Sequence, residues 1–162
     1  MSSELLTILT GALPISEVRG AIPLAIGVFG FAPLKAYFLS VLGNVLPVIP
    51  LLLILHYFSD FLMHRVYFLN RFFNWLFRYT RERHASHFEK HHHRHWRNLW
   101  LSLALFIFVA IPLPLTGVWS GAVAAFIFEI PIWRSVIAIF AGAAAAGLIV
   151  LAATLGVVNF LF

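Results

Sequence analysis

Two ionisable side chains, Glu17 and Arg19, stand within an otherwise apolar stretch of the chain. If this stretch enters a bilayer, such groups should face a cavity or a partner, because charge is costly in hydrocarbon. Desolvation favours a protonated carboxyl group, so Glu17 could bind and release a proton. Arg19 stays charged, and its planar guanidinium suits a phosphate group. The pair predicts a site for a proton and an anion; an ion pair that only holds the backbone is the structural alternative.

A second interruption of the apolar sequence, Pro-Leu-Pro-Leu-Thr-Gly at 112–117, carries a hydroxyl group and a glycine. Here and just beyond, hydroxyl groups could bind substrate or cap the following helix. Glycine lets backbone approach a ligand closely, and the helix start after each break offers free N–H groups to an anion. We expect one site for substrate and proton, formed by Pro14, Glu17, Arg19, Gly20, Pro112, Pro114, Thr116, Gly117, Trp119 and Ser120.

Four histidines in the middle of the chain, His84, His87, His91 and His95, are spaced to share one face of a helix. Such a face could chelate a metal ion. Arginines surround these histidines, and the chain contains no cysteine, which weakens the metal interpretation. A solvated or pH-responsive patch is the alternative. We predict no other cofactor.

The composition predicts an integral membrane protein. Of 162 residues, 62% are hydrophobic and 10% are charged, whereas soluble domains average about 45–50% apolar and about 25% charged. A soluble fold of this size could not bury so much apolar surface. Eight of the eleven lysines and arginines lie between Arg65 and Arg97, which is typical of a cytoplasmic loop. Nothing else resembles a nucleic-acid-binding protein, so we expect no nucleic-acid partner.

Proline, glycine and charge divide the chain into an all-α membrane domain, 1–162. The arms of the first interrupted stretch would be about 14 and 18 Å long as helices, too short to span a core of about 30 Å. We therefore expect re-entrant helical hairpins rather than a single kinked helix. The predicted elements are a hairpin at 5–31, a transmembrane helix at 35–58, a cytoplasmic amphipathic and His-rich region at 59–98, a second hairpin at 99–129 and a second transmembrane helix at 132–160.

The two halves of the chain repeat this order of elements. An offset of 98 residues aligns Leu13-Pro14 with Ile111-Pro112 and Pro33-Leu34 with Pro131-Ile132. Because each hairpin returns to its own side, the halves would insert with opposite orientations. Such inverted repeats with interrupted apolar segments indicate a transporter. We expect the cytoplasmic membrane of a prokaryote, with the central region cytoplasmic and both termini on the other face.

Two stretches, LPISEVRGAIPLAIG at 13–27 and PLPLTGVWSGA at 112–122, resemble the signature regions of the putative small multidrug export protein family. That family is distantly similar to the DedA and SNARE-associated Golgi membrane proteins. The resemblance covers most of the chain apart from the His-rich centre. It implies paired re-entrant hairpins and a transport role, and DedA-like relatives are linked to moving lipid or polyprenyl phosphates. Leu115 stands where the family pattern leads us to expect glycine.

Three functions remain open on the sequence. The first is transport of an amphipathic or lipidic substrate, coupled to protons through Glu17. The second is a flippase or scramblase for a phospholipid or polyprenyl phosphate. The third is a non-transporting scaffold or metal-responsive protein. We find no nucleophile–base arrangement and expect no enzyme activity. Membrane lipid is the expected partner, and small residues four apart in the last helix, Ala143 with Gly147 and Ala152 with Gly156, suit either packing between the halves or a homodimer.

Overall fold

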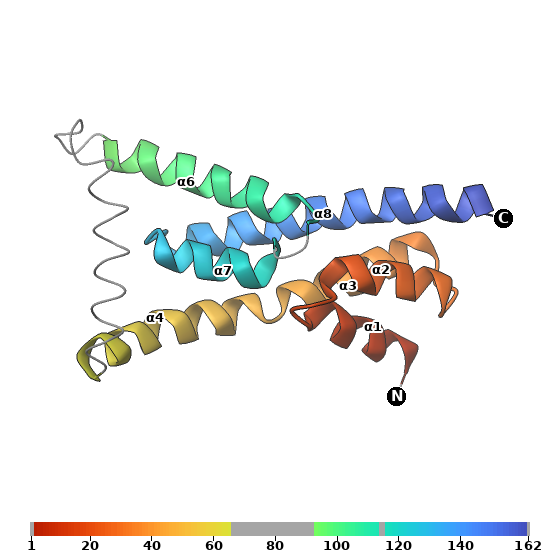
Figure 1. The fold of residues 1–162 in the computed structure, drawn as a ribbon, viewed down its shortest axis with the longest axis horizontal. Helices are drawn as coiled ribbons and strands as arrows, with labels where there is room; N and C mark the ends of the chain where they lie inside the picture. Colours follow the sequence, from red (N-terminus) through yellow and green to blue (C-terminus); the bar gives the residue numbers. More distant parts are fainter. Residues whose placement is uncertain (1, 66–92, 114–115, 162) are drawn as a thin grey trace.

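The computed structural model describes residues 2–65, 93–113 and 116–161. Seven helices are found in these ranges (Figure 1). They are α1 (Ser3–Ala12), α2 (Glu17–Gly27), α3 (Pro33–Val45), α4 (Val48–Arg65), α6 (His93–Ala110), α7 (Val118–Ile127) and α8 (Ile132–Leu161). The described part of the chain has no strand, so the expected all-α class is confirmed there.

α1 and α2 are separate helices that pack against each other and against α3. The Ser2 hydroxyl caps α1 by accepting a hydrogen bond from the Leu5 N–H (3.4 Å). Glu4 at the start of α1 pairs with Lys35 at the start of α3 (2.5 Å), so both helices begin at the same end of the molecule. α2 runs back to that end (Figure 1). The first apolar stretch is therefore a helical hairpin. We expected its break to extend over residues 14–20, but it comprises residues 13–16, and Glu17, Arg19 and Gly20 lie in the first turn of α2.

The second half of the chain has the same order of helix, break and helix. α6 packs along α8, and α7 packs against both. α2 and α7 also end alike, with a residue of positive φ shortly before the next proline: Gly30 (φ 64°) before Pro33, and Glu129 (φ 53°) before Pro131. Each of these left-handed residues ends one helix and turns the chain into the next.

Two helical stretches are long and apolar enough to cross a membrane: Pro33–Tyr57 and Ile132–Val158, with mean hydropathies of 2.4 and 2.5. The first combines α3 with most of α4. The two helices are separated at Leu46 and Pro47, because proline has no N–H to donate to the carbonyl of Gly43, four residues earlier. Pro50 lies in the first turn of α4, where a missing N–H leaves no gap in the helix.

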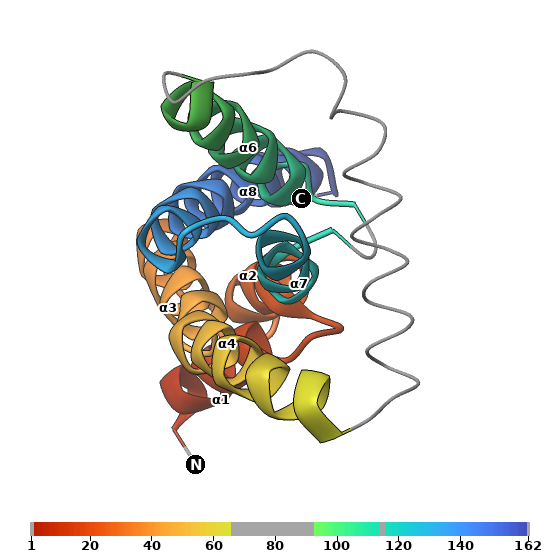
Figure 2. The same cartoon turned by 90° about the vertical axis from the view of Figure 1, so that its left-hand side faces the viewer.

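α2 and α7 lie end to end along the long axis of the molecule, as the views in Figures 1 and 2 agree. Each has its own apolar environment. Val18 and Ile22 of α2 pack with residues of α3 and α8. Val118 and Ala122 of α7 pack in a second cluster with residues of α4, α6 and α8. The longer helices thus support both short ones, and the starts of α2 and α7 meet in the middle.

Glycine brings neighbouring helices into close contact at several points. A Cβ atom on Gly43 would collide with the Ile8 carbonyl of α1, and one on Gly11 would lie 2.7 Å from the Ser40 carbonyl of α3. On α8, a Cβ on Gly147 would lie 2.9 Å from the Tyr37 ring. Of the small residues expected to pack or dimerise, Gly147 therefore packs within the molecule. A Cβ on Gly156 would meet no atom of another described element within 4 Å, and the homodimer stays a prediction.

Replacing Gly43 with alanine should destabilise the protein by about 1–3 kcal/mol, because the added methyl group forces α1 away from α3. The measurement is the apparent unfolding temperature of the purified protein in detergent. Gly156→Ala is the matched control and should be neutral or stabilising by up to about 1 kcal/mol, since alanine favours a helix. Equal melting temperatures for the two variants would contradict the close contact of α1 and α3.

Candidate functional site

The first break and the start of α2 bury a carboxylate and expose apolar side chains. Glu17, the first residue of α2, is only 3% exposed, whereas Ile15 in the preceding turn is 93% exposed. The Ser16 hydroxyl donates back to the Thr10 carbonyl of α1, and Gly20 fits against Ser16, where a Cβ would lie 2.7 Å from the Ser16 Cβ. Pro14 lies exposed in the turn. The turn therefore exposes an apolar tip and buries its carboxylate.

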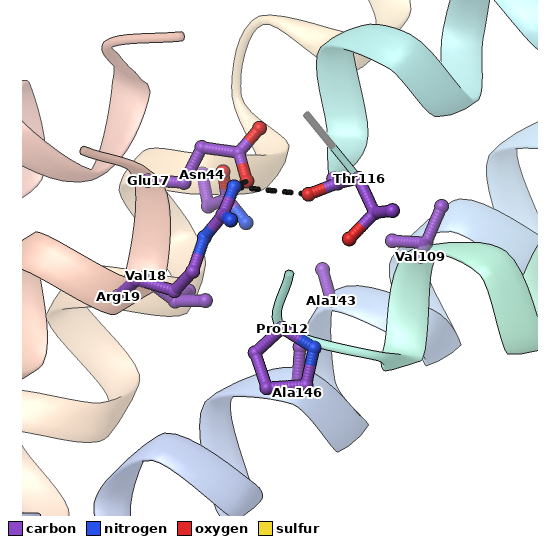
Figure 3. Close-up of a pocket in the computed structure, with 10 residues that line it drawn as sticks. Glu17, Val18, Arg19, Asn44, Val109, Pro112, Thr116, Ala143 and Ala146 are labelled. Atoms are coloured by element: carbon purple, nitrogen blue, oxygen red, sulfur yellow. Dashed lines mark hydrogen bonds and ion pairs between the residues drawn. The ribbon is translucent and has the colours of Figure 1, made fainter. Parts of the chain in front are cut away.

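Arg19 connects the two breaks. Its Nη2 atom lies 3.0 Å from Glu17 Oε2 and donates to the Thr116 carbonyl at 2.9 Å (Figure 3). Its Nη1 atom donates to the Leu113 carbonyl. A guanidinium group presents several donors in one plane, so a single side chain satisfies the carboxylate beside it and two backbone acceptors from the opposite hairpin.

The side chain of Glu17, which belongs to α2, lies against the N-terminus of α7. Its carboxylate accepts hydrogen bonds from the backbone N–H groups of Val118 and Trp119 and contacts Gly117, where a Cβ would collide with both carboxylate oxygens. The first N–H groups of a helix have no partner within it, and the helix dipole attracts negative charge there. The internal carboxylate thus occupies the anion site that the second break was expected to offer.

The backbone of Glu17 is in the left-handed region, with φ 46°. For a residue with a Cβ, this conformation costs roughly 1–3 kcal/mol. The contacts of Glu17 with Arg19 and with the start of α7 hold the residue there. Strain of this kind, at a buried charge, is a feature of functional sites.

The hydroxyl group of Thr116 forms hydrogen bonds with the backbone of the second break. Thr116 Oγ1 donates to the Ile111 carbonyl (2.6 Å) and accepts from the Leu113 N–H (3.1 Å). It does not cap α7, because Gly117 occupies the N-cap position. Ser120 Oγ donates to the Gly117 carbonyl (3.3 Å). Both hydroxyls hold the backbone of the break in shape.

Trp119 forms another connection between the hairpins. Its indole Nε1–H donates to the Ala12 carbonyl at the end of α1 (3.2 Å). With Arg19, this bond joins the two breaks in both directions: an α2 side chain binds the second break, and an α7 side chain binds the end of α1. Two hairpins that are far apart in sequence therefore form one site.

A small cavity, with room for about one water molecule, lies between the breaks and the long helices. Glu17, Arg19, Pro112, Thr116 and Gly117 line it together with residues the sequence analysis did not single out (Figure 3). These are Val18, Asn44, Val109, Ala143 and Ala146. Asn44 is the polar one among them, and a lone amide within an apolar spanning segment could have drawn attention to it.

Some of the predicted site residues lie outside the described ranges. Pro114 lies outside the described residues, as do three of the four proposed metal ligands, His84, His87 and His91. His95 falls in α6. Among the residues that were described, no group of three or more potential metal ligands occurs. The metal site stays a prediction.

Two long apolar helical stretches, with the buried Glu17–Arg19 ion pair of α2 beside them, indicate an integral membrane protein, in agreement with the family match that follows. The family described as putative small multi-drug export protein matches residues 17–149, and the chain belongs to it. The protein is therefore of the membrane-transporter type. Neither the curated proteins nor the solved structures contain a match to this chain. The distant similarity to DedA proteins stays a prediction.

The contact between Gly117 and the Glu17 carboxylate can be tested by a double-mutant cycle. Gly117→Ala should destabilise the protein by about 1–3 kcal/mol, because its methyl group pushes the carboxylate off the start of α7. In a Glu17→Ala background the same change should cost close to nothing. Unfolding temperatures in detergent measure both effects.

Gly121→Ala is the control for this cycle. Its Cβ would lie 2.6 Å from Val109 Cγ2, a contact that does not involve Glu17. Its cost should be the same with and without the Glu17→Ala change. A Gly117→Ala cost that is equally independent of Glu17 would contradict the geometry of the site.

Proposed function

We propose that this protein transports an amphipathic or lipidic substrate with an anionic headgroup, bound where the two breaks meet, and couples its movement to protons through Glu17. The observation that carries the proposal is the position of the Glu17 carboxylate, between Arg19 and the first N–H groups of α7. A cation and a helix N-terminus together are the groups that bind phosphate in proteins. Glu17 takes the place of such a headgroup.

Proton coupling would result from competition between the Glu17 carboxylate and an anionic headgroup for Arg19 and the start of α7. While Glu17 is ionised, its carboxylate holds Arg19 and the amides of Val118 and Trp119. Protonation removes its charge and weakens both interactions. An anionic headgroup can then bind Arg19 and the start of α7 without bringing two negative charges together. The proton and the anion thus enter the site together.

The proposed membrane arrangement is an inverted repeat of two units, each a re-entrant hairpin followed by a spanning helix. α1 and α2 occupy one end of the long axis, and α6 and α7 extend from the other (Figure 1). Both tips carry exposed apolar side chains, including Leu13, Ile15 and Leu113. Lipid is a favourable neighbour for such side chains, and backbone at this depth is tolerated where protein shields its polar groups.

Transport in this scheme needs the hairpins to separate. The cavity between them has room for about one water molecule, far less than a lipid headgroup requires. Breaking the Arg19 and Trp119 contacts between the hairpins would open the space between α2 and α7. Such gating of one repeat against the other is the usual form of alternating access. All steps are binding and release, and we propose no covalent chemistry.

A flippase or scramblase for phospholipid or polyprenyl phosphate would use the same groups. The apolar tips beside the site favour this second function, because a lipid tail could stay in the bilayer while its headgroup passes Arg19. The two functions differ in their dependence on a proton gradient.

The topology can be tested by cysteine labelling, since the chain contains no cysteine of its own. Single cysteines replace Ser2, Arg65 and Phe160 in turn, and a membrane-impermeant maleimide is added to intact cells. We expect Ser2→Cys and Phe160→Cys to react from the same side and Arg65→Cys from the other. Labelling of Ser2→Cys and Phe160→Cys from opposite sides would rule out the inverted repeat.

Transport can be tested in proteoliposomes under an imposed proton gradient. The probes are a short-chain fluorescent phospholipid with an anionic headgroup and ethidium, an amphipathic cation. The wild type should move the anionic probe. Arg19→Ala should slow it about tenfold or more, because a hydrogen bond to a charged group contributes roughly 1.5–3 kcal/mol. Glu17→Gln should remove the dependence on the gradient.

Glu4→Gln is the matched control, because Glu4 is an exposed carboxylate paired with Lys35 outside the site. It should transport as the wild type does. Movement that ignores the gradient in both wild type and Glu17→Gln would favour the scramblase. Preference for ethidium would refute the anionic headgroup, and unchanged activity of both site variants would refute the site.

A further inference from the structure

Asn44 of α3 has a buried side-chain oxygen that is not hydrogen-bonded. The residue is 1% exposed, and its Oδ1 atom accepts no hydrogen bond from the described residues. Leaving a buried acceptor without a donor costs roughly 1–3 kcal/mol, and such groups in native proteins call for an explanation. The oxygen is therefore available to a donor at the cavity.

The side chain of Asn44 lines the same cavity as Glu17 and Arg19 (Figure 3). The walls contributed by α8 and α6 are apolar: Ala143, Ala146 and Val109. The Thr116 hydroxyl, also at the cavity, already donates to carbonyls of its own break. These side chains therefore offer Asn44 no free donor.

The ionised form of the site gives this oxygen no hydrogen bond either. Arg19 directs three of its five N–H donors at the Leu113 carbonyl, the Thr116 carbonyl and the Glu17 carboxylate, and the other two do not bond to Asn44 Oδ1. The N–H groups of Val118 and Trp119 bind the same carboxylate. An ionised carboxylate can only accept hydrogen bonds, whereas a protonated one gains an O–H donor. Protonation of Glu17 thus creates a donor at the cavity that Asn44 lines.

We propose that Asn44 is the positioning residue for the coupling proton: its Oδ1 atom accepts the hydrogen bond of the protonated Glu17 carboxyl group. The inference rests on the proposed role of Glu17 in proton binding and extends it to a residue of the first spanning segment. Of the described side chains that line the cavity, Arg19 is the charged one facing Glu17. α3 presents the neutral Asn44, α7 presents backbone amides, and α8 presents alanines.

This contact gives protonated Glu17 a second position. Ionised, the side chain is held by Arg19 and the start of α7. Protonated, it turns toward α3, where Asn44 accepts its hydrogen bond. The start of α7 and one face of Arg19 are then open to an anion. Asn44 stabilises the protonated side chain away from the anion site and so separates the proton from the headgroup.

Infrared difference spectroscopy of the full chain in liposomes, recorded across a pH titration, tests the proposal without a transported substrate. The carbonyl band of a protonated carboxyl is assigned to Glu17 by its loss in Glu17→Gln. In Asn44→Ala this band should move to higher frequency, because a free carboxyl group has a stiffer C=O bond. Its pH midpoint should fall by up to about one unit, the equivalent of one hydrogen bond of roughly 1 kcal/mol.

Asn44→Ser keeps an acceptor oxygen and should restore part of both shifts. Ser40→Ala is the control: Ser40 is another buried, unpartnered polar residue of α3, but it does not line the cavity, so the band should not move. A folded Asn44→Ala protein, judged by its elution in detergent, with an unchanged band and midpoint would overturn the role of Asn44 alone. Absence of any band that depends on Glu17 would instead refute proton binding by Glu17.

Discussion

A carboxylate buried in a low-dielectric interior must be surrounded by donors, because the cost of removing it from water is otherwise too large. In this protein Glu17 is that group, and the two hairpins meet around it. Arg19 binds it from the same helix, and the N–H groups of Val118 and Trp119 bind it from the opposite hairpin. The negative charge of Glu17 is therefore fully compensated only when the two halves of the chain are folded against each other. The short helices α2 and α7 are positioned for this purpose.

The same requirement explains why the helices around the site differ in length. A helix that ends in the middle of the molecule exposes unpaired N–H groups there, and these groups serve as the donors for the carboxylate. The longer helices α3, α4, α6 and α8 flank the short ones (Figure 2) and supply their apolar packing. A continuous spanning helix in place of α7 would have no free N–H groups at this depth. The N–H groups that bind the Glu17 carboxylate are therefore available because the chain is interrupted before α7.

The sequence predicted much of this architecture because its signals are local. Proline at 14, 33, 112 and 131 marks where helices end or begin, and apolar length distinguishes the two long helical stretches. Glu17 and Arg19 were identified because charge is rare in apolar sequence. The joining of the two breaks, with Arg19 on the Leu113 carbonyl, depends on backbone geometry 94 residues away and leaves no local signal. Asn44 was not predicted, because the sequence criterion for a buried site was charge, and an amide is uncharged.

The close approach of α1 to α3 at Gly43 and Gly11 has a mechanical consequence. Surfaces that meet without intervening side chains have no room to slide, so α1 and α3 should behave as one rigid block. The second half has an equivalent contact, because a Cβ on Gly142 of α8 would lie 2.9 Å from the Phe106 carbonyl of α6. Each hairpin is thus held against its own long helix, and relative motion would fall on the contacts between the hairpins, among them the bond from Trp119 to the Ala12 carbonyl.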